Sequence, residues 1–408
     1  MCEIDVQIGN GRLNYINGYV SKDHDAVDVG LGEYVQRSAT APWLATYRLL
    51  SKSTPCIPEI AIRMAQLPEF EKSYSHVLLF PPQPAAMVDL SARQKGNFSA
   101  KMYGFYLQQN NIALDAHVPI AESFLAKDIH VICDKPLTHN LEDAEKFYKT
   151  VNDSNALFAL THNYTGYPMV RQAREMFRNG DIGKLRIIQV EYAQDWLTLP
   201  IENEGQKQAS WRTDPSKAGM GGSIGDIGSH AFNLADFITG AKLEELCADI
   251  SSFVPGRKND DNAHVLLRYA DNAKGMLWSS QVAPGNENAL KIRIYGEKGG
   301  LTWEQENPNY LTVDIFGKAK KIIRRAGNET IDIGNRVTRI PPGHPEGYLE
   351  GFANIYTDFA KQISSFKNKQ KPPEELLLVP TIEDGLKGVK FISSVVESGS
   401  SGGKWVKF

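Results

Sequence analysis

Three short clusters in the chain contain residue types that could carry out acid–base chemistry. The first is Cys133-Asp134-Lys135-Pro136, which directly follows the apolar run Ile129–Cys133. Such a run is typical of a strand buried in a parallel sheet, and open α/β folds bind ligands at the carboxyl ends of these strands. Because Pro136 favours an extended Lys135, the ammonium group is expected to project there. It could hydrogen-bond a substrate hydroxyl and stabilise negative charge on its oxygen; the alternative is a solvated turn lysine.

The second cluster is the glycine-rich segment GGSIGDIGSH, residues 221–230. Its four glycines allow the backbone to approach a ligand closely. We expect Ser229 to cap a helix over Ser229–Phe237 that stops at Gly240, which places His230 in the first turn. Asp226 could orient the imidazole or accept its N–H, and a histidine steered in this way is a suitable proton shuttle. The alternative is a locally packed histidine. Two candidate ligands without a third predict no metal site.

The third cluster, Ser210–Pro215, contains Trp211 and Arg212. A flat indole face and a planar guanidinium fork suit a nicotinamide or a polyhydroxyl ligand, although a surface Trp–Arg stack is an equally simple interpretation. Two weaker candidates are His162-Asn163-Tyr164, which follows the apolar run Leu157–Leu160, and His344-Pro345-Glu346.

The elements that must position these clusters fall into two blocks. Helices expected over His117–Lys127 and Asn140–Asn152 alternate with the two apolar runs, as in the second half of a doubly wound α/β domain. Beyond a helix expected over Pro168–Asn179, strand-like stretches dominate, and antiparallel pairing is the natural arrangement. These stretches are Leu185–Tyr192, Cys247–Phe253, His264–Tyr269, Gly275–Gln281, Lys291–Tyr295 and Leu301–Glu304. A longer helix over Gly347–Ile363 could pack on this sheet, and Ser364–Pro373 is expected to be a surface loop. The sequence therefore predicts an α/β domain followed by an α+β domain, with a ligand site in the cleft between them.

Bulk properties narrow the class of protein. A length of 408 residues suffices for two domains, and a net charge of −3 provides no basic field for nucleic acid. The four cysteines are spread without the paired spacing of a zinc site or a redox dithiol, which fits a reducing cytoplasm. No apolar run approaches the roughly 18–20 residues of a membrane span, and the N-terminus lacks the pattern of an export signal. A cytoplasmic protein without membrane partners is expected.

The first 116 residues do not look like half of a nucleotide-binding domain. Gly9-Asn10-Gly11 follows Val6 and Ile8, but Asn14 stands where a dinucleotide fingerprint has its third glycine. Gly9 and Gly11 are therefore weak candidates for contact with a pyrophosphate, and an ordinary turn is the alternative.

Together these residues resemble the Gfo/Idh/MocA family, which includes glucose–fructose oxidoreductase and inositol 2-dehydrogenase. The resemblance covers about residues 117–408. His117–Ala121 followed by Asp128–Leu137 is similar to the family segment that ends in Glu/Asp-Lys-Pro. Further blocks that match in order and spacing are Trp211-Arg212, residues 221–230 and Tyr295–Leu301.

The resemblance implies a Rossmann-like parallel-sheet domain over residues 1–163, poorly matched over 1–116. It also implies an α+β domain over 164–408 with a large open, mainly antiparallel sheet that binds substrate and forms a homo-oligomer. The implied activity is hydride transfer between NAD or NADP and a carbinol carbon of a sugar, inositol or related polyol. The implied catalytic residues are Lys135, Asp226 and His230. Implied cofactor contacts are Asp134, Lys135, His117, Trp211 and Arg212, and implied substrate contacts are Lys135, Asn163, Tyr164, Asp226 and His230.

The N-terminal stretch departs from this pattern, since Ile112–Ala116 replaces the Thr-Pro-Asn turn of the family. One hypothesis is that part of this stretch is read out of frame. The other is divergence, with a different or absent cofactor site. In that case the chain would be a catalytically impaired relative that binds carbohydrate or forms oligomers without a dinucleotide.

Overall fold

The computed structural model describes residues 3–8, 11–16 and 117–408, which belong to two units that divide between Met102 and Tyr103. In the first unit, β1 (Glu3–Ile8) and β2 (Gly11–Ile16) form an antiparallel hairpin with Ile8 opposite Gly11. Gly9 lies outside the described residues. Gly11 begins a strand, whereas the glycine turn of a dinucleotide fingerprint leads into a helix.

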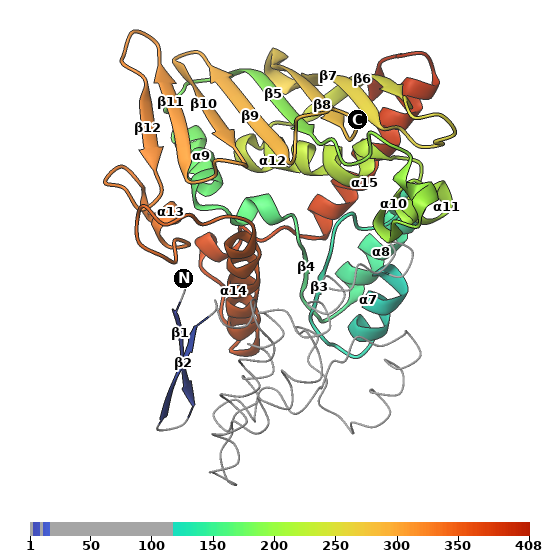
Figure 1. Ribbon diagram of the computed structural model, residues 1–408. Helices are drawn as coiled ribbons and strands as arrows, with labels where there is room; N and C mark the ends of the chain where they lie inside the picture. The colour runs from blue at the N-terminus through green and yellow to red at the C-terminus, as the bar shows by residue number, and fades with distance from the viewer. Residues whose placement is uncertain (1–2, 9–10, 17–116) are drawn as a thin grey trace. The chain divides into compact units, whose positions relative to one another are not determined.

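The described part of the second unit begins with a small α/β segment (Figure 1). Its elements are α7 (His117–Leu125), β3 (Val131–Cys133), α8 (Leu141–Asp153) and β4 (Phe158–Leu160). The two strands pair in parallel, and Asn140 caps α8 by accepting a hydrogen bond of 2.8 Å from the Asp143 amide. The predicted alternation of helix and strand is confirmed, with α7 ending two residues before Lys127.

A nine-stranded sheet forms the larger part of the second unit. Its strands are β5 (Leu185–Ala193), β6 (Leu243–Ser251), β7 (Asn262–Tyr269), β8 (Lys274–Ser280), β9 (Ala289–Gly296), β10 (Gly299–Glu304), β11 (Tyr310–Ile315), β12 (Lys321–Arg324) and β13 (Val406–Lys407). The order is β12-β11-β10-β9-β5-β8-β7-β6-β13, and every neighbouring pair is antiparallel except β5 and β8. A mainly antiparallel sheet is therefore confirmed. The sequence predicts β5 to β10, with β6 placed four residues late, and misses β11 to β13.

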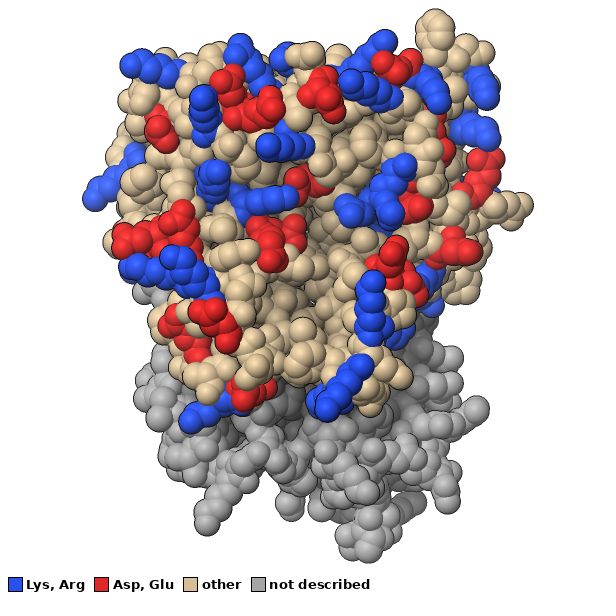
Figure 2. Space-filling view, turned by 180° about the vertical axis from the view of Figure 1, so that it is seen from behind, with Lys and Arg blue, Asp and Glu red and all other residues tan. Residues whose placement is uncertain are grey.

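One face of this sheet is covered by α9 (Pro168–Arg178), α12 (Ser229–Thr239) and α15 (Ile382–Ser400) (Figure 1). Strand residues alternate between the two faces. Ile188 is fully buried under these helices, whereas its neighbour Ile187 is 45% exposed on the other face. Side chains of both charge signs are interspersed over the described part of the surface in Figure 2.

The helix α14 (Tyr348–Lys367) packs against the short helix η3 (Asn163–Gly166). A side chain at Gly166 would overlap the Gly351 carbonyl oxygen, so this close approach requires glycine. Because α14 runs to Lys367, the predicted loop from Ser364 starts too early. The remaining short elements are η4 (Ile201–Glu204), α10 (Lys207–Arg212), α11 (Pro215–Ala218), η5 (Ile224–Gly228), η6 (Ala270–Asn272), α13 (Asp332–Asn335) and η7 (Glu374–Leu376). Among the helices that the structure describes, none is long and apolar enough to cross a membrane.

A buried ionic contact ties α14 to α9. The Asp358 carboxylate accepts hydrogen bonds of 2.7 Å from Arg171 Nη1 and 2.7 Å from Arg336 Nη1. The side chains of Arg171 and Asp358 are 0% and 2% exposed. Removal of the shared carboxylate would leave two guanidinium groups uncompensated, one of them fully buried.

We expect Asp358→Asn to lower the free energy of unfolding by about 3–5 kcal/mol, the usual cost of breaking a buried ion pair. Urea denaturation followed by circular dichroism measures this change. Asp314→Asn is the matched control, because Asp314 pairs with Lys320 on the surface and such pairs contribute about 0–1 kcal/mol. Equal losses in the two variants would contradict the role given to Asp358.

Candidate active site

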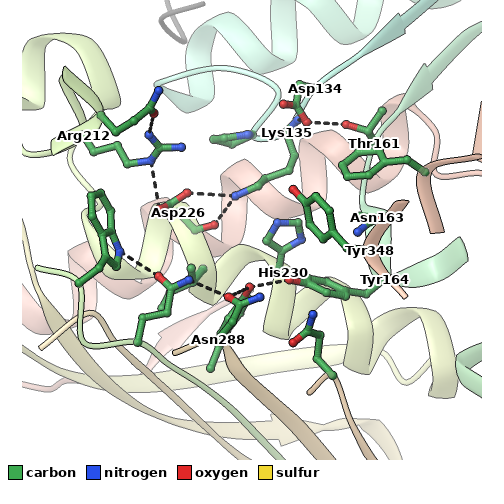
Figure 3. Close-up of a pocket in the computed structure, with 18 of the residues that line it drawn as sticks. Asp134, Lys135, Thr161, Asn163, Tyr164, Arg212, Asp226, His230, Asn288 and Tyr348 are labelled. Atoms are coloured by element: carbon green, nitrogen blue, oxygen red, sulfur yellow. Dashed lines mark hydrogen bonds and ion pairs between the residues drawn. The ribbon is translucent and has the colours of Figure 1, made fainter. Parts of the chain in front are cut away.

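Described residues line a cavity of about 700 Å³ in the second unit, shown in Figure 3. They come from the carboxyl ends of β3 and β4, from α10, from η5 and α12, from the ends of β5 and β9, and from α14. Every predicted catalytic residue lies here, and so do all the predicted cofactor and substrate contacts beyond residue 116. These residues are His117, Asp134, Lys135, Asn163, Tyr164, Trp211, Arg212, Asp226 and His230.

Lys135 reaches across the cavity to Asp226. It follows β3 directly, and its Nζ donates to the Asp226 backbone oxygen and, at 3.2 Å, to Asp226 Oδ1. The Lys135–Pro136 peptide bond is cis. An ammonium group has three donors, and two of them serve Asp226. No described residue accepts from the third, which leaves it for a ligand oxygen in the cavity.

The Asp226 carboxylate is held by several donors. Besides Lys135, it accepts from Arg212 Nε at 3.2 Å and from Gln281 Nε2 at 2.9 Å, both at Oδ2. Burial by itself would raise the pKa of the Asp226 carboxyl, but Arg212 and Lys135 outweigh it and hold that pKa well below its ordinary value. Asp226 is therefore an anion that neutralises cations, and it is not a proton donor near neutral pH.

The glycine-rich segment is helical from Ile224 onward, so a further helical turn precedes the helix expected over Ser229–Phe237. Residues Ile224–Gly228 form the π-helical turn η5, which continues directly into α12. Ser229 does not cap α12, because its Oγ donates to the Gly225 carbonyl at 2.8 Å. The predicted helix end at Gly240 is confirmed by a φ of +60° there.

His230 lies among aromatic rings, without the expected hydrogen bond to Asp226, whose carboxylate is engaged by cations and an amide. Its ring centroid is 4.9 Å from that of Tyr164 and 5.7 Å from that of His162. Burial lowers the pKa of His230 well below its ordinary value, and Lys135 and His162 lower it further. The imidazole is therefore neutral. Its Nδ1 is buried without a partner in residues 117–408, which leaves Nε2 as the nitrogen open to the cavity.

The residues next to Lys135 fix the start of the loop that follows β3. Asp134 Oδ1 accepts from Thr161 Oγ1 at 2.5 Å and from the Lys135 amide at 2.9 Å, so it joins the ends of β3 and β4. The ring Nδ1 of His117 lies 3.3 Å from the Pro136 carbonyl oxygen. The described ranges contain no group of three or more His, Cys, Asp or Glu residues arranged to hold a metal ion.

Trp211 and Arg212 contact each other, as one interpretation of their motif predicts, and both also line the cavity. The Arg212 guanidinium carbon lies 4.3 Å from the Trp211 ring centroid, and the same guanidinium also binds Asp226 in the cavity. The weaker candidate Glu346 has a different role, since it is buried and accepts from Arg325 Nη1 at 3.0 Å. Its neighbour His344 is exposed.

Sequence reasoning missed half of the cavity wall. The missed residues include Tyr192, Gln194, Trp196, Asn288, Gln305, Tyr348 and Phe352. Alternation along β5 carried a usable signal, because Tyr192, Gln194 and Trp196 stand at every second position where that strand ends. The others come from distant segments that only the folded sheet and α14 bring together.

Comparisons with known proteins support this geometry. Residues 109–162 match the family model described as "Oxidoreductase family, NAD-binding Rossmann fold", and residues 170–302 match "GFO/IDH/MocA C-terminal domain". The uncharacterized oxidoreductase YfiI of Bacillus subtilis is 32% identical over 300 residues, which cover 72% of this chain and 75% of that protein. The chain belongs to the Gfo/Idh/MocA family of oxidoreductases.

Two solved structures extend the comparison. An oxidoreductase from Sinorhizobium meliloti is 51% identical with a TM-score of 0.64, and the match covers 72% of this chain and 76% of that one. An inositol dehydrogenase homolog from Azotobacter vinelandii, complexed with NADH and myo-inositol, is 30% identical with a TM-score of 0.66 and the same coverage. The predicted Rossmann-like fold class is confirmed, and NAD or NADP is the cofactor of the matched fold.

The described residues fit the reactive end of such a cofactor. A dihydronicotinamide ring is flat and uncharged and carries one carboxamide that forms hydrogen bonds, and the cavity offers Trp211 and Tyr348 rings beside the Lys135 ammonium group. Trp211 Nε1 is buried and has no hydrogen-bond partner among the described residues. Such unpaired polar atoms are rare in folded proteins, and they indicate a site completed by a polar ligand.

The acid stability of the protein should depend on His162. Burial lowers the pKa of His162 to about 3 from 6.5, with a smaller effect of Lys135. Below pH 6.5 the unfolded chain therefore binds a proton that the folded chain does not, and stability falls as the pH drops. We expect the free energy of unfolding of the wild type to fall by about 1 kcal/mol per pH unit more steeply than that of His162→Asn between about pH 6 and pH 5.

Urea denaturation at a series of pH values measures the slope. The exposed His344 provides the control, since His344→Asn should keep the wild-type slope. Equal slopes in the wild type and His162→Asn would contradict a buried neutral imidazole at position 162.

Proposed function

We propose that this chain is an NAD(P)-dependent dehydrogenase that transfers hydride between the nicotinamide and a carbinol carbon of a sugar, inositol or related polyol. The observation that carries the proposal is the convergence of Lys135, Asp226 and His230 in one cavity at the ends of β3 and β4. The relative complexed with NADH and myo-inositol supports the same substrate class.

Each of the three residues has a distinct chemical role. When bound, the nicotinamide supplies the hydride acceptor or donor. His230 Nε2 is open to the cavity and belongs to a neutral imidazole, so it can take the proton of the substrate hydroxyl as the carbonyl forms. The third donor of the Lys135 ammonium group stabilises negative charge on that oxygen. Asp226 holds the ammonium group in place, and Arg212 binds the other oxygen of the Asp226 carboxylate.

The alternative is a family member that no longer binds the dinucleotide. The observation behind it is the N-terminal stretch, in which Gly11 opens a strand and the family model begins at residue 109. Fluorescence titration with NADH and NADPH separates the two functions. Binding of either supports the dehydrogenase, and binding of neither overturns it for this chain.

The domain boundary and the association state belong to the same proposal. We place the cofactor-binding domain in residues 1–163 and the substrate-binding domain in residues 164–408.

The open face of the sheet carries apolar side chains on three adjacent strands, with Ile187, Leu266 and Met276 45%, 50% and 48% exposed. Contiguous exposed apolar residues mark association surfaces, so this face would join copies of the chain.

Loss of the acid–base groups should slow turnover strongly. We expect Lys135→Met and His230→Asn each to lower kcat about 100-fold or more, the usual contribution of general acid–base catalysis. NAD(P)H formation from a panel of sugars and inositols measures this effect. Lys146→Met replaces an exposed lysine on α8 and should retain wild-type turnover. Wild-type turnover in the Lys135 or His230 variant would refute the assigned roles.

Charge on the open sheet face should break the oligomer. We expect Leu266→Glu combined with Met276→Glu to shift the chain from an oligomer to a monomer, because Leu266 and Met276 lie directly opposite each other and two like charges there would be buried without a partner. Sedimentation velocity measures the mass. Leu199→Glu is the control, since Leu199 is 64% exposed but lies outside the sheet. A monomeric wild type would contradict the association surface.

A further inference from the structure

A row of hydrogen bonds crosses the sheet side of the cavity (Figure 3). Trp196 Nε1 donates to Gln194 Oε1 at 3.0 Å, and Gln194 Nε2 donates to Asn288 Oδ1 at 2.8 Å. Tyr192 Oη donates to the same Asn288 oxygen at 2.7 Å, and the hydroxyls of Tyr192 and Tyr164 are 2.5 Å apart. All five side chains line the cavity.

The direction of every bond in this row follows from its two ends. An indole N–H can only donate, so Gln194 must turn its oxygen toward Trp196 and its amide nitrogen toward Asn288. A second constraint on Gln194 comes from Gln281. The Asp226 carboxylate can only accept, so Gln281 must turn its Nε2 toward Asp226 Oδ2, 2.9 Å away. The same Nε2 lies 3.5 Å from Gln194 Oε1. The Trp196 indole N–H and the Gln281 amide nitrogen therefore impose the same orientation on Gln194.

The orientation of Asn288 follows in turn. Its Oδ1 accepts from both Gln194 and Tyr192, so its Nδ2 must point away from them. Within residues 117–408 no acceptor meets this Nδ2, although the residue lines the cavity. The single proton of the Tyr192 hydroxyl is used on Asn288, so Tyr164 must donate to Tyr192. Asn288 consequently presents an N–H donor to a ligand.

We propose that Asn288 is a specificity-determining residue, which donates from Nδ2 to one hydroxyl oxygen of the polyol away from the reacting carbon. Trp196 is then a positioning residue, because its indole N–H sets the direction in which Gln194 and Asn288 point. The inference rests on the proposed function and names one contact of its substrate. A site built to bond a substrate oxygen discriminates strongly against an analogue that lacks it, because the buried donor is left unpaired.

The first test compares the best substrate with its monodeoxy analogues. In the wild type, removal of one particular hydroxyl away from the reacting carbon should lower kcat/KM about tenfold or more. In Asn288→Leu, kcat/KM for the parent substrate should fall by a similar factor through a higher KM, while kcat/KM for that one deoxy analogue stays unchanged. The variant should therefore no longer discriminate between the two. Fluorescence titration with the reduced cofactor verifies that the variant is folded.

The second test addresses the direction of the hydrogen bond between Asn288 and the substrate. Fluorine in place of the recognised hydroxyl can accept a weak hydrogen bond but cannot donate one. The wild type should retain more activity on this analogue than on the deoxy analogue, whereas Asn288→Asp, which presents an acceptor, should lose that preference. Trp196→Phe removes the indole donor together with one ring of the side chain, and it should weaken the preference and raise KM with little change in kcat. In Asn288→Leu the Trp196→Phe change should have no further effect, since coupled residues are not additive.

Asn286→Asp is the matched control, because Asn286 lies in the same loop, donates to the Ala283 carbonyl and does not line the cavity. It should keep the wild-type analogue profile. If the wild type transfers hydride but Asn288→Leu discriminates among the deoxy analogues as the wild type does, the inference is overturned and the proposed function stands. If the wild type transfers hydride from no member of the panel with either cofactor, the proposed function fails and the inference fails with it.

Discussion

The Asp226 carboxylate is shared between Lys135 and Arg212, so that one negative charge serves two cations on the wall of the cavity. This sharing sets the protonation states around it. The Lys135 ammonium group pairs with Asp226, and its positive charge helps to keep His230 neutral by lowering the pKa of that imidazole. A charged donor and a neutral proton acceptor thereby coexist in one small space, which is the combination that alcohol oxidation needs. Gln281 extends this arrangement from the carboxylate to the amides on the sheet side of the cavity.

The rest of the unit holds this charge arrangement in place from several directions. The loop after β3 is fixed by Asp134 and Thr161, and η5 leads directly into α12 against the sheet. The helix α14 contributes Tyr348 to the cavity at one end and is tied to α9 through Asp358 near its middle. Rigid elements on three sides therefore fix the relative positions of groups that are distant in sequence, which preorganises the site for its ligand.

The sequence predicted the elements and residues that a local sequence pattern indicates. Lys135 follows a clear apolar strand, and His230 follows an unusual run of glycines, so both were found. The helix α15 was missed because Gly385, Gly388 and Gly399 look like helix breakers. In the structure, Gly385 lies against Leu137 and Gly399 against Ile250, and a larger residue would crowd them, so packing outweighs the local preference. Asn288 could not be found from its neighbours in the sequence, since its role depends on strand pairing that brings it to Tyr192 and Gln194.

The π-helical turn η5 also has a consequence for how this site could change in evolution. A π turn holds about one residue more than an α turn, so such turns amount to single-residue insertions in a helix. Each added or removed residue rotates the two sides of the helix by about 100° relative to one another. Deletion of one residue from Ile224–Gly228 would therefore leave α12 and its hydrophobic face intact while turning Asp226 out of phase with His230. Substitution can retune this cavity gradually, but the angular relation between its carboxylate and its imidazole is set in whole-residue steps.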